Sequence, residues 1–142
     1  MKIIVLTGKN GCGKTAALHF VHEKLIVSGE KPTCFEHLNG ATHRDFCDVV
    51  MYRKKKIAVY TTGDTKILVE NAMKYGEQKG CFVLICACNT GFAGASEKIE
   101  QIRSNPENMV IEKTVGSDLI SSFEANCFDG YRVLTALESM IV

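Results

Sequence analysis

The segment Gly8–Thr15 contains three glycines and ends in Lys14-Thr15. It lies between a continuous apolar run, residues 2–7, and an amphipathic stretch, residues 14–28. A β-branched run of this kind is typical of a strand that is buried on both faces, and the spacing of apolar residues after it predicts a helix. Glycines at such a junction allow backbone conformations that a Cβ atom would obstruct. The chain therefore opens with a strand, a glycine-rich turn and a helix that ends near Gly29.

The rest of the chain alternates short apolar runs with stretches of helical periodicity. Further strands are predicted at residues 33–37, 56–61, 81–87 and 109–112, and further helices at residues 64–75, 96–104, 117–126 and 130–141. Residues 40–53 favour a short helix or a loop that packs inward. Strands that alternate with helices predict parallel pairing through helical crossovers. We expect one domain, residues 1–142, with a three-layer α/β/α fold and a mainly parallel sheet of about five strands.

Composition excludes several classes of protein. The chain is 46% hydrophobic and 23% charged, which is ordinary for a folded domain and excludes a disordered chain. Its 17 basic and 16 acidic residues give a net charge of +1, so the balance supports neither a nucleic-acid partner nor a membrane surface. The longest apolar run, residues 81–88, is too short to span a bilayer.

The seven cysteines are an odd number and lie mostly in apolar, strand-like runs. Buried thiols of this kind act as small hydrophobic groups. The first residues lead directly into the first strand and do not read as a secretion signal. We expect a cytoplasmic protein that requires no disulfide.

The glycine-rich segment also fits the spacing G-x-x-x-x-G-K-[ST]. In such a loop the backbone N–H groups and the following helix N-terminus surround an anion. Lys14 would add a positive charge beside the β and γ phosphates, and the Thr15 hydroxyl would be a ligand for Mg²⁺. The candidate phosphate-binding residues are Gly8, Asn10, Gly11, Cys12, Gly13, Lys14, Thr15 and Ala16.

With this loop between a strand and a helix, the chain resembles the P-loop NTPase superfamily. The resemblance implies that Gly8–Thr15 binds the triphosphate of ATP or GTP, and that a carboxylate at the end of a central strand assists Mg²⁺. Asp64 is our candidate for this metal and catalytic role, because it follows the apolar strand 56–61. The alternative is that Asp64 only caps the helix that follows. Glu36 and Asp48 are the next candidates.

Other polar residues lie near the expected ligand edge of the sheet. Asn89 or Thr90 resembles the polar γ-phosphate sensor of some ATPases, and the alternative is a flexible turn with Ser96 capping the next helix. Arg44 and Asp45 lie in the region that carries the acceptor-binding segment in small P-loop kinases. The run Arg53–Lys56 reads as a solvated strand entry.

The first predicted helix also carries His19, His22 and Glu23. We interpret these three as surface residues rather than as a metal site.

Three functions remain open: a Mg²⁺-dependent ATPase of low intrinsic turnover, a small-molecule or nucleotide kinase, and a nucleotide-binding switch or scaffold. The chain has four arginines and no arginine-rich lid, which argues against a kinase. Asp64 is followed by Thr65 rather than by a glutamate that would activate water, which argues against fast hydrolysis. The guanine motif Asn-Lys-x-Asp is absent, so ATP is the preferred triphosphate. An unidentified protein partner or a homo-oligomer is left open.

Overall fold

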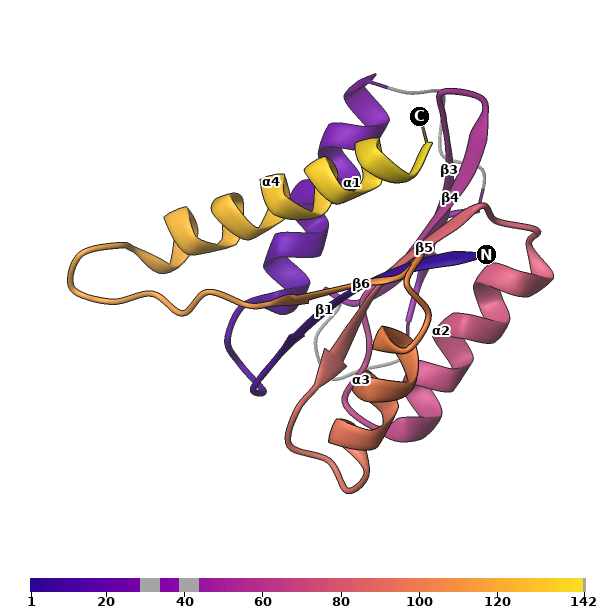
Figure 1. Ribbon diagram of the computed structural model, residues 1–142. Coiled ribbons are helices and arrows are strands. Elements are labelled where there is room, and N and C mark those ends of the chain that lie inside the picture. Colours follow the sequence, from indigo (N-terminus) through magenta and orange to yellow (C-terminus); the bar gives the residue numbers. More distant parts are fainter. Residues whose placement is uncertain (29–33, 39–43, 142) are drawn as a thin grey trace.

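The computed structural model describes residues 1–28, 34–38 and 44–141, and it has an α/β fold (Figure 1). Six strands form one sheet in the order β2-β3-β4-β5-β1-β6. The strands are β1 Lys2–Gly8, β2 Glu36–His37, β3 Phe46–Tyr52, β4 Lys55–Tyr60, β5 Val83–Asn89 and β6 Met109–Glu112. The helices are α1 Lys14–Ser28, α2 Lys66–Gln78, α3 Ala95–Arg103 and α4 Ser122–Ile141.

The sheet is mixed, so the expectation of a mainly parallel sheet of about five strands is wrong. The pairings β1–β5, β1–β6 and β4–β5 are parallel, whereas β2–β3 and β3–β4 are antiparallel. The difference arises at residues 46–52, which form β3 rather than the expected helix or loop. Arg53 and Lys54, with φ angles of 49° and 64°, form a two-residue turn between β3 and β4. Such a turn returns the chain directly beside itself and leaves no crossover helix.

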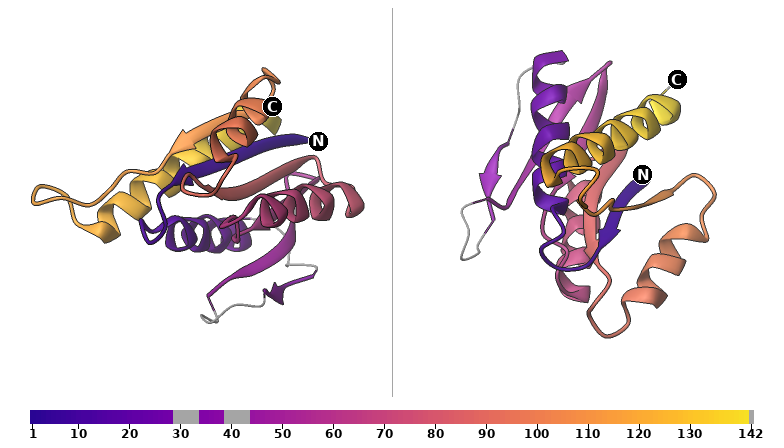
Figure 2. Two further views of the ribbon diagram at one scale, coloured as in Figure 1. Left: turned by 90° about the horizontal axis from the view of Figure 1, so that it is seen from below. Right: turned by 90° about the vertical axis from the view of Figure 1, so that its left-hand side faces the viewer.

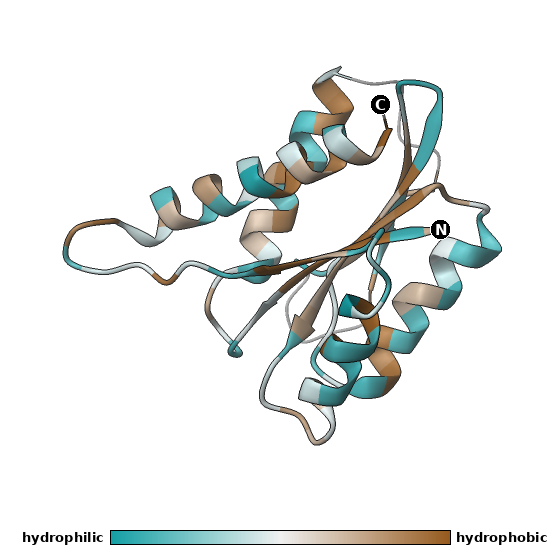
Figure 3. Cartoon of the chain, viewed as in Figure 1, coloured by the Kyte–Doolittle hydropathy of each residue, from teal (hydrophilic) through white to brown (hydrophobic). Residues whose placement is uncertain are grey.

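Helices cover both faces of the sheet, as the three-layer expectation requires. Figures 1 and 2 show α1 and α4 on one face and α2 and α3 on the other. Each face has its own buried cluster, which includes Ile4 and Leu6 on the α1–α4 side and Val5 and Leu84 on the α2–α3 side. Figure 3 shows the hydrophobic strands between helices whose outer surfaces are largely hydrophilic.

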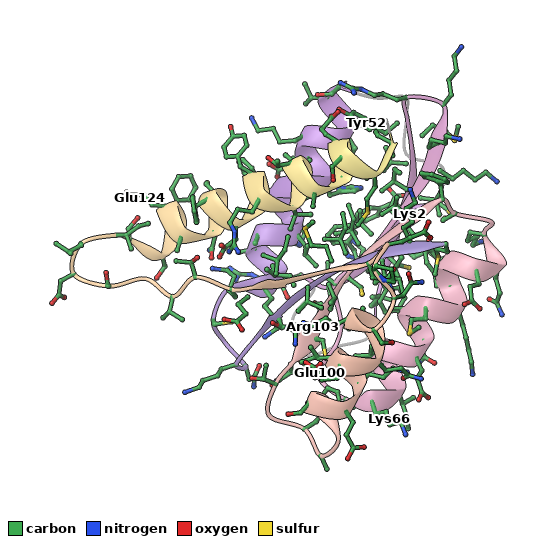
Figure 4. The ribbon with its side chains drawn as sticks, in the orientation of Figure 1. Lys2, Tyr52, Lys66, Glu100, Arg103 and Glu124 are labelled. Carbon is green, nitrogen blue, oxygen red and sulfur yellow. The ribbon has the colours of Figure 1, made fainter. Side chains whose placement is uncertain are left out.

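The last part of the chain forms one long helix, α4, and not the two helices expected at 117–126 and 130–141. Gly130 lies inside this helix, where a Cβ atom would collide with the ring of Phe20 on α1. Gly130, expected as the first residue of the second helix, is therefore the point where α4 approaches α1. At the far end of the helix, Glu138 accepts a hydrogen bond from the hydroxyl of Tyr52, which ties the β3–β4 hairpin to α4 (Figure 4).

Four chain segments meet at one edge of the sheet. The amide of Thr90 donates to the carbonyl of Gly8 at 3.0 Å, and the amide of Asn89 donates to the carbonyl of Gly63 at 2.8 Å. The amide of Thr61 donates to the carbonyl of Phe46 at 3.1 Å. Because β3 runs antiparallel to β4, its first residue joins the carboxyl ends of β4, β5 and β1. The strand β5 separates β1 from β4.

A few expectations fall on undescribed parts of the chain. Gly29 as a helix end, Thr33 as the start of the second strand, and residues 40–43 lie outside the described residues. Within the described residues, no helix combines the length and the apolar character needed to cross a bilayer.

Candidate functional site

The Gly8–Thr15 loop connects the end of β1 to the first residue of α1, as expected. Gly11 and Gly13 have φ angles of +76° and +96°, in the left-handed region that favours glycine. A Cβ atom on Gly13 would also collide with the side-chain oxygen of Asn126 on α4. The first amides of a helix have no intrahelical acceptor, so the start of α1 presents N–H donors to the loop. The loop therefore has the backbone of an anion cradle.

The side chain of Lys14 folds back over this loop. Its Nζ donates hydrogen bonds to the carbonyls of Gly8 at 3.0 Å and Lys9 at 2.7 Å, with Sγ of Cys12 at 3.8 Å. The residue is only 7% exposed. Within the described residues, no carboxylate lies at ion-pair distance from its ammonium group. Lys14 is thus a buried lysine whose ammonium group has no carboxylate partner among the described residues.

The carboxylate of Asp45 lies beside Thr15, although the sequence placed Asp45 in a possible acceptor-binding region and not among the metal ligands. Oδ1 of Asp45 accepts hydrogen bonds from the hydroxyls of Thr15 at 3.3 Å and Thr61 at 2.9 Å. Asp45 directly precedes β3, so the antiparallel direction of β3 brings it to the loop. Arg53-Lys54 is not one of the glycine-containing pairs that favour such a two-residue turn, so the sequence carried no clear signal of this hairpin.

Asp64 reaches the same edge from β4. It is exposed and lines a cavity of about 300 Å³ together with Lys9, Asn10, Asn89, Gly91 and Phe92. A Cβ atom on Gly63 would collide with the carbonyl oxygen of Ala87, so this glycine lets the chain pass close against β5 just before Asp64. The alternative that Asp64 caps α2 is wrong, because the cap is Thr65, whose hydroxyl accepts from the amide of Leu68 at 3.2 Å.

Asn89 is a further polar side chain of this cavity. It is 8% exposed, and its Oδ1 accepts a hydrogen bond from the amide of Gly91 at 2.7 Å. Its amide nitrogen is therefore the donor end that remains for a ligand. Ser96 does not cap α3, because Gly94 occupies that position with φ +83° and makes no side-chain cap.

Two further acidic candidates lie away from the loop. Asp48 is fully buried, and it is bound by Nε2 of His22 at 2.7 Å and by the amides of Val49 and Cys34. The prediction that His22 is a surface residue is wrong, because it faces β3 and is 6% exposed. Glu36 is exposed on β2 opposite Cys47. Both carboxylates belong to the β2–β3 side of the sheet.

Lys113 is a second buried lysine near the loop. Nζ of Lys113, which follows β6, is 3.0 Å from Oδ2 of Asp129 on α4, and both side chains are fully buried. Asp129 also binds Thr114 and Arg132. Burial opposes ionisation of this carboxyl, but the hydrogen bonds from Lys113, Thr114 and Arg132 outweigh it and lower the pKa of Asp129. This pair fixes α4 beside the loop.

The described side chains do not by themselves form a complete metal-binding site. Within the described residues, no three His, Cys, Asp or Glu side chains come together as a metal site. Thr15 and Asp45 nevertheless present a hydroxyl and a carboxylate oxygen, which are the donors that Mg²⁺ accepts. These two oxygens fit a Mg²⁺ ion whose other ligands are phosphate oxygens and water.

The chain was compared with protein families, curated proteins and solved structures. No family model, no curated protein and no solved structure matches it.

Proposed function

We propose that this chain binds a nucleoside triphosphate, with ATP preferred, together with Mg²⁺ in the Gly8–Thr15 loop, and hydrolyses it slowly. The observation that carries the proposal is the buried ammonium of Lys14, which has no carboxylate partner within the described residues and lies inside a glycine loop at a helix N-terminus. A buried charge without a counter-charge is costly, and a polyanion would balance it.

The neighbouring side chains support the same chemistry. Thr15 and Asp45 would hold Mg²⁺, which supplies positive charge against the β and γ phosphates, and Asp64 would act through the cavity beside them. The amide nitrogen of Asn89 would donate to a terminal phosphate oxygen. Slow hydrolysis fits the sequence Asp64-Thr65, which lacks an adjacent glutamate to orient water.

A second candidate is transfer of the phosphate to a small acceptor. The cavity beside Lys9 and Asp64 measures about 300 Å³, which is enough for a small molecule next to the loop. Phe92 gives this cavity an apolar wall. A nucleotide-binding switch that neither hydrolyses nor transfers remains the third reading of the same loop.

One experiment separates the three functions. Purified protein is mixed with Mg²⁺ and ATP or GTP, and nucleotide binding is measured by calorimetry while phosphate release is followed. The same mixture is repeated with a panel of nucleosides, nucleotides and small alcohols. Release without an acceptor supports the ATPase, consumption only with an acceptor supports the kinase, and binding alone supports the switch.

The matched variants for this experiment are Lys14→Ala, which removes the buried charge, and Lys66→Ala, which removes an exposed lysine at the start of α2. We expect the first to weaken triphosphate binding by about 2 to 4 kcal/mol and the second to leave it unchanged. Absence of nucleotide binding by the unaltered protein, or equal affinity in Lys14→Ala, would contradict the proposal.

A further inference from the structure

In the chain between β6 and α4, Lys113 and Thr114 are held by Asp129, and residues 115–121 form an arm that extends beyond the body of the protein (Figure 1). Its apolar side chains point to solvent. Val115 is 66% exposed, Leu119 is 97% exposed, and Phe123 in the first turn of α4 is 76% exposed. Figure 4 shows the side chains of this region, near the labelled Glu124, projecting away from the rest of the molecule. Apolar groups at such exposure mark an interaction surface.

A groove with matching character lies further along the same helix. It measures about 530 Å³ and lies between α4 and the edge strand β6. Its apolar walls include Met109, Phe128 and Tyr131, which are 40%, 53% and 55% exposed. The groove therefore has room for a leucine and a phenylalanine side chain.

We propose that two copies of this chain associate by a two-fold exchange, in which the arm of each copy enters the α4–β6 groove of the other. A projecting apolar element and an apolar recess on one chain can satisfy each other in a closed, symmetric dimer. The six side chains named above leave on the order of 700 Å² exposed, so pairing two copies would bury about 1,400 Å² in total, within the range of specific interfaces.

Charge favours the same exchange. The groove wall contains Arg132, whose side chain is 40% exposed, and the adjoining buried group contains Lys113 against the single carboxylate of Asp129. Arg132 is therefore the partly exposed cation of this positive corner, and it shares the Asp129 carboxylate with Lys113. The arm carries Asp118, which is exposed, directly before Leu119. Insertion of the arm would bring the Asp118 carboxylate toward the positive corner of the partner's groove.

The test is the oligomeric state of the full chain by sedimentation velocity at protein concentrations from about 1 to 100 μM. We expect a concentration-dependent dimer. Leu119→Ser on the arm and Thr135→Trp, which fills the groove from an exposed position on α4, should each raise the dimer dissociation constant at least about tenfold. The matched control is Ile67→Ser, because Ile67 is 68% exposed on α2, on the other face of the sheet.

Mixing the two variants tests the exchange itself. A homodimer of either variant has both arm–groove contacts impaired, whereas the mixed dimer keeps one intact arm in one intact groove. We expect the mixture to dimerise more tightly than either variant alone. A monomer at every concentration, a dimer that neither variant weakens, an equal loss in Ile67→Ser, or no recovery in the mixture would each overturn the proposal.

Discussion

Lys14 and Lys113 follow neighbouring strands, β1 and β6, and are buried to almost the same degree, but their charges are balanced in different ways. Lys113 lies 3.0 Å from a carboxylate oxygen of Asp129, whereas the partners of Lys14 among the described residues are two carbonyl oxygens of its own loop and Sγ of Cys12. A buried charge that the protein neutralises itself contributes to structure. A buried charge without such a partner is costly, and under the proposed function a bound triphosphate would balance it.

The largest expected effect is on the neutralised lysine. Asp129→Asn removes the counter-charge and leaves the ammonium of Lys113 buried and unpaired. We expect a loss of about 3 to 5 kcal/mol in the free energy of unfolding, measured by urea denaturation. A loss below about 1 kcal/mol would mean that this pair is not structural and would remove the difference between the two lysines.

The opposite variant should affect binding and spare stability. Lys14→Ala removes a buried charge that has no carboxylate partner among the described residues, so the free energy of unfolding should be unchanged or slightly raised. Triphosphate binding should weaken by about 2 to 4 kcal/mol in calorimetry. If Lys14→Ala lowers the free energy of unfolding as strongly as Asp129→Asn does, then Lys14 has a structural role like that of Lys113.

Acid should affect the surroundings of the two lysines differently, because among the described residues only Lys113 has a carboxylate partner. The pKa of Asp129 lies below its ordinary value, since the hydrogen bonds from Lys113, Thr114 and Arg132 outweigh the effect of burial. The carboxylate therefore stabilises the fold fully above about pH 4, and this stability is lost as the pH falls through the lowered pKa. As the pH falls through that window, the urea concentration at the unfolding midpoint should decrease in the unaltered protein. It should decrease less in Asp129→Asn.

The carboxylates near Lys14 should have smaller, metal-dependent effects. Asp45→Asn should raise the Mg²⁺ concentration that half-saturates nucleotide binding by about tenfold, because Asp45 contacts Thr15, and Asp64→Asn should raise it less. Asp64→Ala should change stability by less than about 0.5 kcal/mol, since Thr65 is the helix cap. If Asp64→Asn raises this Mg²⁺ concentration more than Asp45→Asn does, then Asp64 rather than Asp45 is the metal ligand.

The smallest expected effect concerns the thiols. None of the seven cysteines is in a disulfide. The melting temperature should therefore be the same, within error, with and without a reductant. A clear decrease on reduction would show that a disulfide contributes to the stability on which the first comparison depends.

Local patterns predicted the loop side of the molecule well. The strand of residues 2–7, the glycine segment and the helix from Lys14 each depend on residues close in sequence, and the structure confirms all three. The helix from Ala95 and the strand Met109–Glu112 were likewise within a residue or two of their predicted bounds. The chemistry expected of the loop stays a prediction.

The β2–β3 side of the sheet depends on contacts between residues far apart in sequence, which no local pattern contains. The segment Phe46–Tyr52 mixes Cys, Asp and aromatic residues, so its periodicity did not indicate a strand, and its antiparallel direction comes from a two-residue turn. Without that strand, neither Asp45 beside Thr15 nor His22 against Asp48 could be foreseen. The continuous α4 was missed for a related reason, because the reason for a glycine inside it, the close approach of Phe20 at Gly130, is a contact far away in sequence.

The cysteines also make one face of this protein chemically observable. Four of them, Cys47, Cys81, Cys86 and Cys88, belong to the cluster between the sheet and α2–α3, and the opposite cluster contains none among its described members. Burial raises the pKa of Cys86 to about 12, so an alkylating reagent meets an unreactive, inaccessible thiol until that layer opens. The labelling rate at these positions therefore measures how often α2 and α3 detach from the sheet, while motion of α1 and α4 leaves it unchanged.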